Sequence, residues 1–280
     1  MPGELLNDAP PPAALVTGAS SGIGEALAKD LAARGYRMIL ASENGPELER
    51  VRAQIAASVP VETRALTEDL TLPGAGARLY ERCRELGWPV EVLVNCAGIF
   101  LNLERELADP ASAERLLALH VQTPTQLCLR FGSEMIARRR GFILNVGSIS
   151  ALFPDPSSLT YGPSKRYLIV LSAGLRLSWR EHGVRVCCLV PGGTRTGFFA
   201  HNSIYLPGMV AGRLYPVEKC ARKALGALFR GRGRVTPGLS AHLNVLLFRL
   251  LLRPLFYGFS KRQYFRLKSA GRAGRPPVRL

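Results

Sequence analysis

Short apolar runs alternate with amphipathic stretches along the first two hundred residues. The amphipathic stretches place apolar residues at helical spacing, as Ile23, Leu27 and Leu31 do. The apolar runs are continuous, as is typical of strands that are buried on both faces of a parallel sheet. The pattern predicts strands at 14–18, 37–42, 61–66, 90–95, 141–148 and 184–193, and helices at 22–34, 47–57, 76–86, 111–139 and 158–180.

Alternating strands and helices predict an α/β fold, a Rossmann-like doubly wound parallel sheet with helices on both faces. We expect residues 13–235 to form one domain, after a flexible segment at 1–12 and before an apolar and basic extension at 236–280. The chain has 280 residues, of which 47% are hydrophobic and 21% are charged, so it can bury a substantial core and is globular in composition.

The cysteines predict neither a metal site nor disulfides. The sequence has no C-x-x-C pair, and Cys187 and Cys188 are adjacent within an apolar run, where we expect core residues. The N-terminal segment MPGELLNDAPPPAA lacks the basic and then apolar pattern of a signal peptide. We therefore expect reduced thiols and a cytoplasmic protein.

Positive charge is concentrated in the last quarter of the chain. Residues 213–280 contain sixteen lysines and arginines against one acid, Glu218, and so carry +15 of the total net charge of +16. Within this quarter, residues 239–259 are strongly apolar but include Arg249 and Arg253. The longest stretch without a charge has 14 residues, which is fewer than the ~18 that a membrane-spanning helix needs.

Three interpretations of this extension are open. Residues 239–279 resemble an interfacial anchor, whose apolar side chains enter a bilayer while its basic ones meet anionic headgroups at the inner face of the membrane. The alternative is a helical arm that packs on a second subunit. Nucleic-acid binding is the least favoured, because only the pair Tyr264 and Phe265 among basic residues supports it.

Two motifs suggest chemistry. TGASSGIG, at 17–24, places three glycines where the first strand meets the first helix. A turn without Cβ atoms allows a pyrophosphate to approach the backbone, and the helix N-terminus offers amides and the positive end of a dipole. A turn that is tight for structural reasons alone is the alternative. TYGPSK, at 160–165, places Tyr161 and Lys165 on one face of a helix.

Together with three further segments, these motifs resemble the short-chain dehydrogenase/reductase family over roughly residues 12–200. TGASSGIG resembles the cofactor turn of the family, NCAG at 95–98 its N-x-A-G element, and PGGTRT at 191–196 its P-G segment. NVGS ends at Ser148, and Tyr161 and Lys165 follow in the family's order.

The resemblance implies a set of site residues. The catalytic residues would be Ser148, Tyr161 and Lys165, with His120 as a candidate proton relay. The cofactor would contact Thr17, Gly18, Ser20, Ser21, Gly22, Ile23, Gly24, Ser42, Asp69, Leu70, Asn95, Ala97, Gly98, Tyr161, Lys165, Pro191, Gly192, Thr194 and Thr196.

The expected chemistry is hydride transfer between a nicotinamide and a carbonyl carbon. A phenol has a pKa of about 10, and we expect the cation of Lys165 and an oxidised nicotinamide to lower it. Tyr161 could then exchange a proton with the carbonyl oxygen, while Ser148 donates a hydrogen bond to that oxygen.

The sequence departs from the family pattern at two places. HVQT, at 120–123, puts His120 where the family has an asparagine that positions a water beside the lysine. His120 could relay protons itself, or it could be a packing residue. At the end of the second strand, Ser42 replaces the acid that binds a ribose 2′-hydroxyl in NAD users. Glu43 would repel a 2′-phosphate if it faced inward. The alternative is that Glu43 faces outward and Ser42 contacts the ribose. Ser42 and the reductase-like overall pattern slightly favour NADP over NAD.

Apolar residues predict an apolar ketone or alcohol as substrate, such as an acyl chain, a steroid-like ring system or a polyketide. These residues are Phe153, Pro154, Leu159, Phe198, Phe199, Tyr205, Leu206 and Met209. The family also implies a homo-oligomer, a dimer or a tetramer. The alternative function is a non-catalytic protein that senses nicotinamide redox state or acts as a scaffold at a membrane.

Overall fold

The structure is a computed structural model that describes residues 11–155, 157–198, 202 and 214–238. Seven parallel strands form the main sheet in the order β3-β2-β1-β4-β5-β6-β9. The strands are β1 (Ala13–Thr17), β2 (Arg37–Ser42), β3 (Thr63–Thr67), β4 (Val90–Asn95), β5 (Gly141–Val146), β6 (Val184–Leu189) and β9 (Arg234–Val235). A second pair joins β7 (Thr194–Arg195) to β8 (Tyr215–Pro216).

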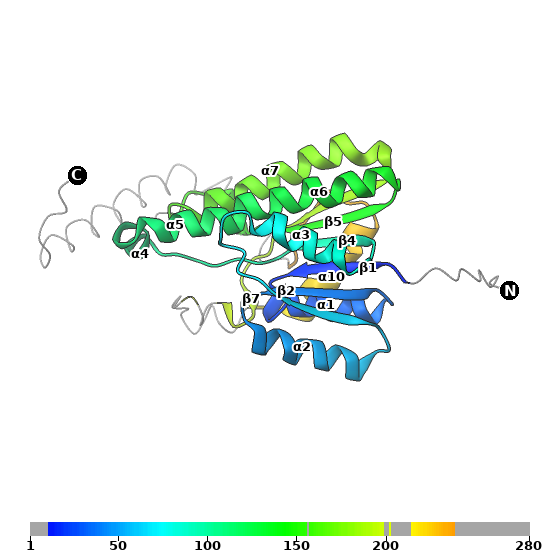
Figure 1. The fold of residues 1–280 in the computed structure, drawn as a ribbon. Helices are drawn as coiled ribbons and strands as arrows, with labels where there is room; N and C mark the ends of the chain where they lie inside the picture. The colour runs from blue at the N-terminus through cyan, green and yellow to red at the C-terminus, as the bar shows by residue number, and fades with distance from the viewer. Residues whose placement is uncertain (1–10, 156, 199–201, 203–213, 239–280) are drawn as a thin grey trace, which may run out of the picture.

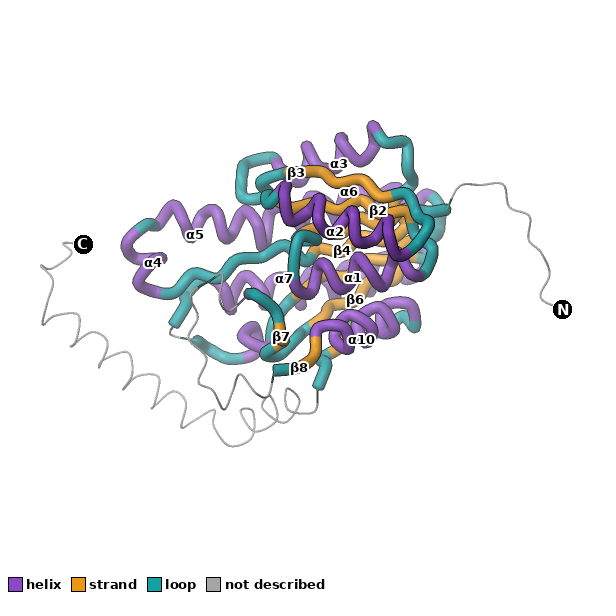
Figure 2. The backbone as a smooth tube through the Cα atoms, turned by 90° about the horizontal axis from the view of Figure 1, so that it is seen from below, coloured by secondary structure: helices purple, strands orange, loops and turns teal. Residues whose placement is uncertain are grey.

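Helices cover both faces of the sheet, as the sequence predicted (Figure 1). One face packs on α1 (Gly22–Ala33), α2 (Gly45–Ser58) and α10 (Val217–Phe229), the face that Figure 2 looks onto. The other face packs on α3 (Ala75–Glu85), α6 (Thr123–Ala137) and α7 (Tyr161–Trp179). Each layer has its own apolar core, so the Rossmann-like prediction is confirmed.

The long helix predicted at 111–139 contains an irregularity. It consists of α5 (Pro110–Leu117), a π-helical turn, η1 (Ala118–Gln122), and α6. The turn contains His120, and such single π turns are frequent at functional sites. The other predicted elements lie within a few residues of the observed ones, except that the strand predicted at 184–193 ends at Leu189, two residues before Pro191.

Several elements had not been predicted. They are α4 (Leu103–Ala108), the short helices η2 (Ile149–Leu152) and η3 (Arg180–His182), β7, β8, α10 and β9. β9 adds to the sheet edge at β6 and ends at Val235. The domain limits at residues 12 and 235 stay predictions, since most of the two flanking segments lies outside the described residues.

The described residues contain neither a helix long and apolar enough to cross a membrane nor a group of three or more metal-ligating side chains. All six cysteines are free, and five of them are buried.

The packing of α6 against α7 generates a prediction about two glycines. A Cβ on Gly132 of α6 would lie 2.4 Å from the Trp179 ring at the end of α7, whereas one on Gly174 of α7 would meet nothing within 4 Å. Alanine in a helix interior is favoured over glycine by roughly 1 kcal/mol. Gly174→Ala should therefore stabilise the fold by about that amount, and Gly132→Ala should destabilise it by roughly 1–3 kcal/mol through overpacking.

Denaturant unfolding of the two matched variants measures both effects. An equal gain in the free energy of unfolding for both would show that α6 and α7 do not pack as described.

Candidate active site

The site lies where the order of strands in the sheet reverses, between β1 and β4. The carboxyl ends of the parallel strands share one edge, and a crevice opens at such a switch point. Thr17, at the end of β1, joins the two strands through one hydroxyl: its Oγ1 accepts from the Cys96 and Ala97 amides at 3.0 and 3.2 Å and donates to the Val94 carbonyl at 3.4 Å. The loops after β1 and β4 are thereby held together.

The glycine turn fits a dinucleotide. Gly18 and Gly22 have φ values of +65° and +57°, which side chains rarely adopt. A Cβ on Gly18 would lie 2.8 Å from Ala97 Cα, and one on Gly24 would lie 2.0 Å from the Gly18 oxygen. The side chain of Ser21, the N-cap of α1, makes no capping hydrogen bond, so the amides at the start of α1 are not capped by it. The turn therefore has the backbone cradle and the helix N-terminus that bind a pyrophosphate.

Ser42 is buried at the end of β2 and lies beside this turn. Its hydroxyl is 2.9 Å from the Ser20 hydroxyl and accepts from the Asn44 amide at 3.3 Å. The adjacent Glu43 is exposed.

Asp69 and Leu70 follow β3 near the same edge. Asp69 Oδ1 accepts from the amide and hydroxyl of Thr71 at 2.9 and 2.7 Å, which fixes the carboxylate in a turn. The carbonyl of Leu70 accepts from Thr123 Oγ1 at 3.0 Å. The loop after β3 is thereby attached to the start of α6.

The segment after β6 covers the glycine turn. A Cβ on Gly22 would lie 3.2 Å from the Thr196 side chain. The Thr194 hydroxyl donates to the Gly192 carbonyl at 3.0 Å, and the Pro191 carbonyl accepts from the Ile149 amide at 3.0 Å. PGGTRT and TGASSGIG are therefore neighbours at this edge of the sheet.

The three predicted catalytic side chains meet beyond β5. Lys165 is buried and donates from Nζ to the Val146 carbonyl at 3.2 Å, and its Nζ lies 5.8 Å from the centre of the Tyr161 ring. The Ser148 hydroxyl lies close enough to the Tyr161 phenol to favour its ionised form. A Cβ on Gly98 would lie 3.1 Å from Lys165 Nζ, so this glycine allows the ammonium to approach the backbone after β4.

Burial controls the protonation of this pair. It raises the pKa of Tyr161 to about 12, although the Ser148 hydroxyl acts in the opposite direction. It lowers the pKa of Lys165 to about 8. The sequence led us to expect that Lys165 and an oxidised nicotinamide together lower the phenol pKa. With the side chains alone, burial raises it instead.

His120 is engaged at both ring nitrogens. Nε2 accepts from the Ile99 amide at 3.1 Å. Nδ1 lies 3.0 Å from Ser164 Oγ, whose one proton goes to the Tyr161 carbonyl, so Nδ1 carries the hydrogen of a neutral ring. Burial, followed by the charge of Lys165, lowers the pKa of His120 well below its usual value. This geometry favours a packing and positioning role over a proton relay.

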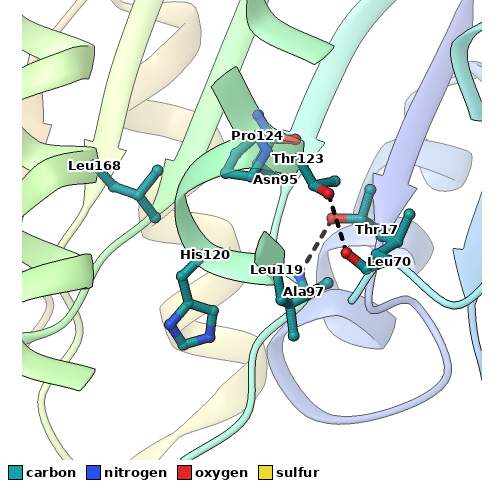
Figure 3. Close-up of a pocket in the computed structure, with 9 residues that line it drawn as sticks. All are labelled: Thr17, Leu70, Asn95, Ala97, Leu119, His120, Thr123, Pro124 and Leu168. Atoms are coloured by element: carbon teal, nitrogen blue, oxygen red, sulfur yellow. Dashed lines mark hydrogen bonds between the residues drawn. The ribbon is translucent and has the colours of Figure 1, made fainter. Parts of the chain in front are cut away.

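A small cavity lies beside this histidine (Figure 3). Its volume of about 10 Å³ is enough for a single water molecule at most. Asn95 lines it, and the buried Oδ1 of Asn95 has no hydrogen-bond partner, while its Nδ2 donates to Asn145 at 2.8 Å. The lining residues are Thr17, Leu70, Asn95, Ala97, Leu119, His120, Thr123, Pro124 and Leu168.

Sequence reasoning missed several residues next to Tyr161. The Phe100 ring lies 5.2 Å from the Tyr161 ring, and the Phe100 amide donates to Asn202 Oδ1 at 2.8 Å. The Phe198 ring, which had been predicted, lies 6.2 Å from the Tyr161 ring. Phe199, Tyr205, Leu206 and Met209 lie outside the described residues. A phenylalanine two residues after NCAG was the only signal available for Phe100.

The buried neutral state of His120 predicts a pH dependence of stability. In the unfolded chain the imidazole takes up a proton below pH 6.5, whereas in the fold it stays neutral to a much lower pH. The unfolded state therefore binds more protons, and stability falls as the pH drops from 7 to 5, by about 2 kcal/mol at pH 5.

Chemical denaturation at several pH values checks this. His120→Asn should remove this part of the pH dependence, while His182→Asn, which replaces an exposed histidine, should retain it. Identical slopes for His120→Asn and the native protein would contradict a buried neutral imidazole.

Comparison with known proteins agrees with this arrangement. The family model for short chain dehydrogenases matches residues 12–204. The very-long-chain 3-oxoacyl-CoA reductase of Anas platyrhynchos is 29% identical over 184 residues, 64% of this chain, and the 7beta-hydroxysteroid dehydrogenase of Clostridium sardiniense is 29% identical over 204 residues, 73% of this chain. The aligned parts are 58% and 77% of those two proteins, so the match spans little more than half of the first.

A solved structure has the same fold. The short-chain dehydrogenase from Sphingobium yanoikuyae in complex with NADPH is 28% identical, with a TM-score of 0.75 over 84% of this chain and 92% of the other. The chain belongs to the short chain dehydrogenase family.

Proposed function

We propose that the protein is an NAD(P)(H)-dependent oxidoreductase that interconverts a ketone and a secondary alcohol on an apolar substrate. The observation that carries this proposal is the meeting of Tyr161, Ser148 and Lys165 beyond β5, on the same sheet edge as the glycine turn. A non-catalytic nicotinamide sensor or scaffold is the alternative, and it would bind cofactor without turnover.

In this proposal each residue has one task. The nicotinamide, when bound, supplies or accepts the hydride. Tyr161 gives its phenolic proton to the carbonyl oxygen or, in the reverse direction, takes one from the alcohol, and Ser148 donates a hydrogen bond to that oxygen. Lys165 binds the nicotinamide ribose, and its cation favours the phenolate. The glycine turn and the N-terminus of α1 hold the pyrophosphate.

The proposed substrate is apolar. Phe100 and Phe198 flank the Tyr161 ring, and neither side chain carries charge. The relatives named above act on an acyl-CoA and on hydroxysteroids, according to their names. An acyl chain or a steroid-like ring system could pack against these two aromatic rings.

NADP is the preferred cofactor in this proposal. Ser42 lacks the negative charge that would repel a 2′-phosphate, and Glu43 is exposed. The Sphingobium structure contains NADPH.

We also propose a homo-oligomer, which would cover apolar side chains on α6 and α7. Leu129 is 53% exposed, Val170 59% and Leu177 81%. Exposed apolar groups of this kind are common where subunits meet.

A peripheral contact of residues 239–279 with the inner face of a membrane is proposed as well. The extension lies outside the described residues, but the surface before it is basic. No ion pair in the described part of the chain involves a cation beyond Arg140. The exposed Arg185, Arg230, Arg232 and Arg234 lie in or beside the turn that follows α10.

Tyr161→Phe tests the proposed chemistry. The variant keeps the ring but has no proton to exchange, so kcat for reduction of an apolar ketone should fall at least about 100-fold, which is within the usual range for loss of a general acid. Cofactor affinity should stay within about twofold of the native value. Tyr167→Phe, the same substitution at an exposed tyrosine of α7, serves as the control. Steady-state kinetics measure kcat, and a cofactor titration measures the affinity. An active Tyr161→Phe variant would exclude the mechanism.

Vesicle sedimentation tests the membrane contact. The full chain should pellet with phosphatidylglycerol vesicles and remain in the supernatant with phosphatidylcholine vesicles. Arg249→Glu combined with Arg253→Glu should weaken pelleting at least tenfold, because each basic residue near an anionic surface contributes roughly 1 kcal/mol. A helical arm between subunits would instead give the same pelleting with both lipids.

A further inference from the structure

Glu106 is a buried acid beside the proposed active site that the chemistry above does not use. It lies on α4 and is 7% exposed. Its Oε1 accepts from Ser158 Oγ at 3.1 Å, from the Thr160 amide at 3.0 Å and from Thr160 Oγ1 at 2.5 Å, and its Oε2 accepts from the Leu159 amide at 2.7 Å. No lysine or arginine in the described part of the chain forms an ion pair with it. The hydrogen bonds therefore compensate for the burial of this carboxylate.

The groups that Glu106 binds directly precede Tyr161, the first residue of α7. Thr160 is the N-cap of α7, but its side chain makes no capping bond and donates to Glu106 instead. Ser158 Oγ, which donates to Glu106, also accepts from the Tyr161 amide at 3.2 Å. One carboxylate thus fixes three consecutive residues and, through Ser158, the backbone of Tyr161.

The other side of this first turn is held by His120. Ser164 Oγ donates to the Tyr161 carbonyl at 2.8 Å and lies 3.0 Å from His120 Nδ1, while His120 Nε2 accepts from the Ile99 amide. The amide and the carbonyl of Tyr161 are therefore anchored separately, and both anchors lead back to the segment after β4.

That segment, residues 99–106, also contacts the reacting side chain. The Phe100 ring packs edge-on against the Tyr161 ring, and the Leu103 amide donates to the Ser157 carbonyl at 2.7 Å. Displacing Glu106 would release the loop at 157–160 and the start of α7 together. Lys165 lies one turn further along α7, where its bond to Val146 provides an independent attachment. The displacement would therefore change the position of the Tyr161 phenol relative to Lys165 and Ser148.

We propose that Glu106 is a positioning residue for the oxidoreductase reaction: its carboxylate clamps residues 158–160 and so sets the position of the Tyr161 phenol. This inference rests on the function proposed above. The carboxylate oxygens of Glu106 accept from residues 158–160, so in this proposal Glu106 acts through Tyr161. Misplacement of a reacting group by about 1 Å can cost about 100-fold in rate.

Two substitutions remove the clamp to different degrees. Glu106→Gln keeps the shape but replaces one acceptor oxygen by a donor, which leaves at least one of the bonded amides without a partner. Glu106→Ala removes all four hydrogen bonds. Glu104→Ala is the matched control, because Glu104 lies on the same helix with an exposed side chain.

Kinetics with a saturating reduced cofactor separate positioning from a general loss of fold. We expect kcat to fall about 10-fold for Glu106→Gln and about 100-fold for Glu106→Ala, while the cofactor Kd and the substrate KM stay within about threefold of the native values. Glu104→Ala should match the native protein. A kcat within twofold of native for Glu106→Ala would overturn the proposal, and so would a loss of kcat that is matched by an equal loss of cofactor affinity.

Thr160→Val checks that the effect passes through the clamp. Valine has the shape of threonine but cannot donate to Glu106. Combining it with Glu106→Ala should lower kcat no further than Glu106→Ala alone, because the two groups share one interaction. Additive losses would contradict the clamp.

Hydrogen exchange tests the clamp without any turnover. In Glu106→Gln and Glu106→Ala, the amides of residues 159–161 should exchange at least tenfold faster, while those of β4 and β5 keep their protection. If the native protein reduces no ketone, the proposed function fails, but this exchange pattern still reports on the clamp. Unchanged exchange at 159–161 would refute the clamp whether or not the protein is an enzyme.

Discussion

The hydroxyl of Thr17 is the contact on which the site depends most. Parallel order alone brings the ends of β1 and β4 to one edge of the sheet, but the crossovers leave these strands in opposite directions and would open a gap. Thr17 Oγ1 closes it with hydrogen bonds to both amides after Asn95 and to the Val94 carbonyl. This closure brings Gly18 close to Ala97. A side chain on Gly18 would push the two loops apart, so the position requires a glycine.

Burial is the second constraint, and it opposes the ionisation of the side chains that the site brings together. The same packing that excludes water from Lys165 and Tyr161 makes the lysine amine a weaker base and the phenol a weaker acid, with pKa values of about 8 and about 12. The protein stabilises these groups by fixed dipoles: Val146 offers a carbonyl to the ammonium, and Ser148 offers a hydroxyl to the phenol. His120 shows the same behaviour, since burial lowers its pKa and favours the neutral imidazole.

The sequence predicted the sheet and most helices because apolar runs and glycine turns are local signals, and it predicted the order of Ser148, Tyr161 and Lys165 through a family resemblance. It did not predict α10 and β9, because their apolar positions lie within a strongly basic stretch to which no helix or strand was assigned. The part played by Glu106 could not be predicted either. Its partners are more than fifty residues away along the chain, and nothing in LERELA distinguishes this glutamate from the exposed Glu104.

The central claim is that this crevice binds a nicotinamide dinucleotide for hydride transfer. Its most direct test is a fluorescence titration of the native protein with NADPH and, in parallel, with NADH. The account predicts saturable micromolar binding of one reduced cofactor per chain, with NADPH bound more tightly because Ser42 stands where an acid would repel its 2′-phosphate. Tighter binding of NADH would reverse the cofactor preference and leave the site intact. Binding of neither would contradict the account, since the glycine turn would then be a structural feature of the fold alone.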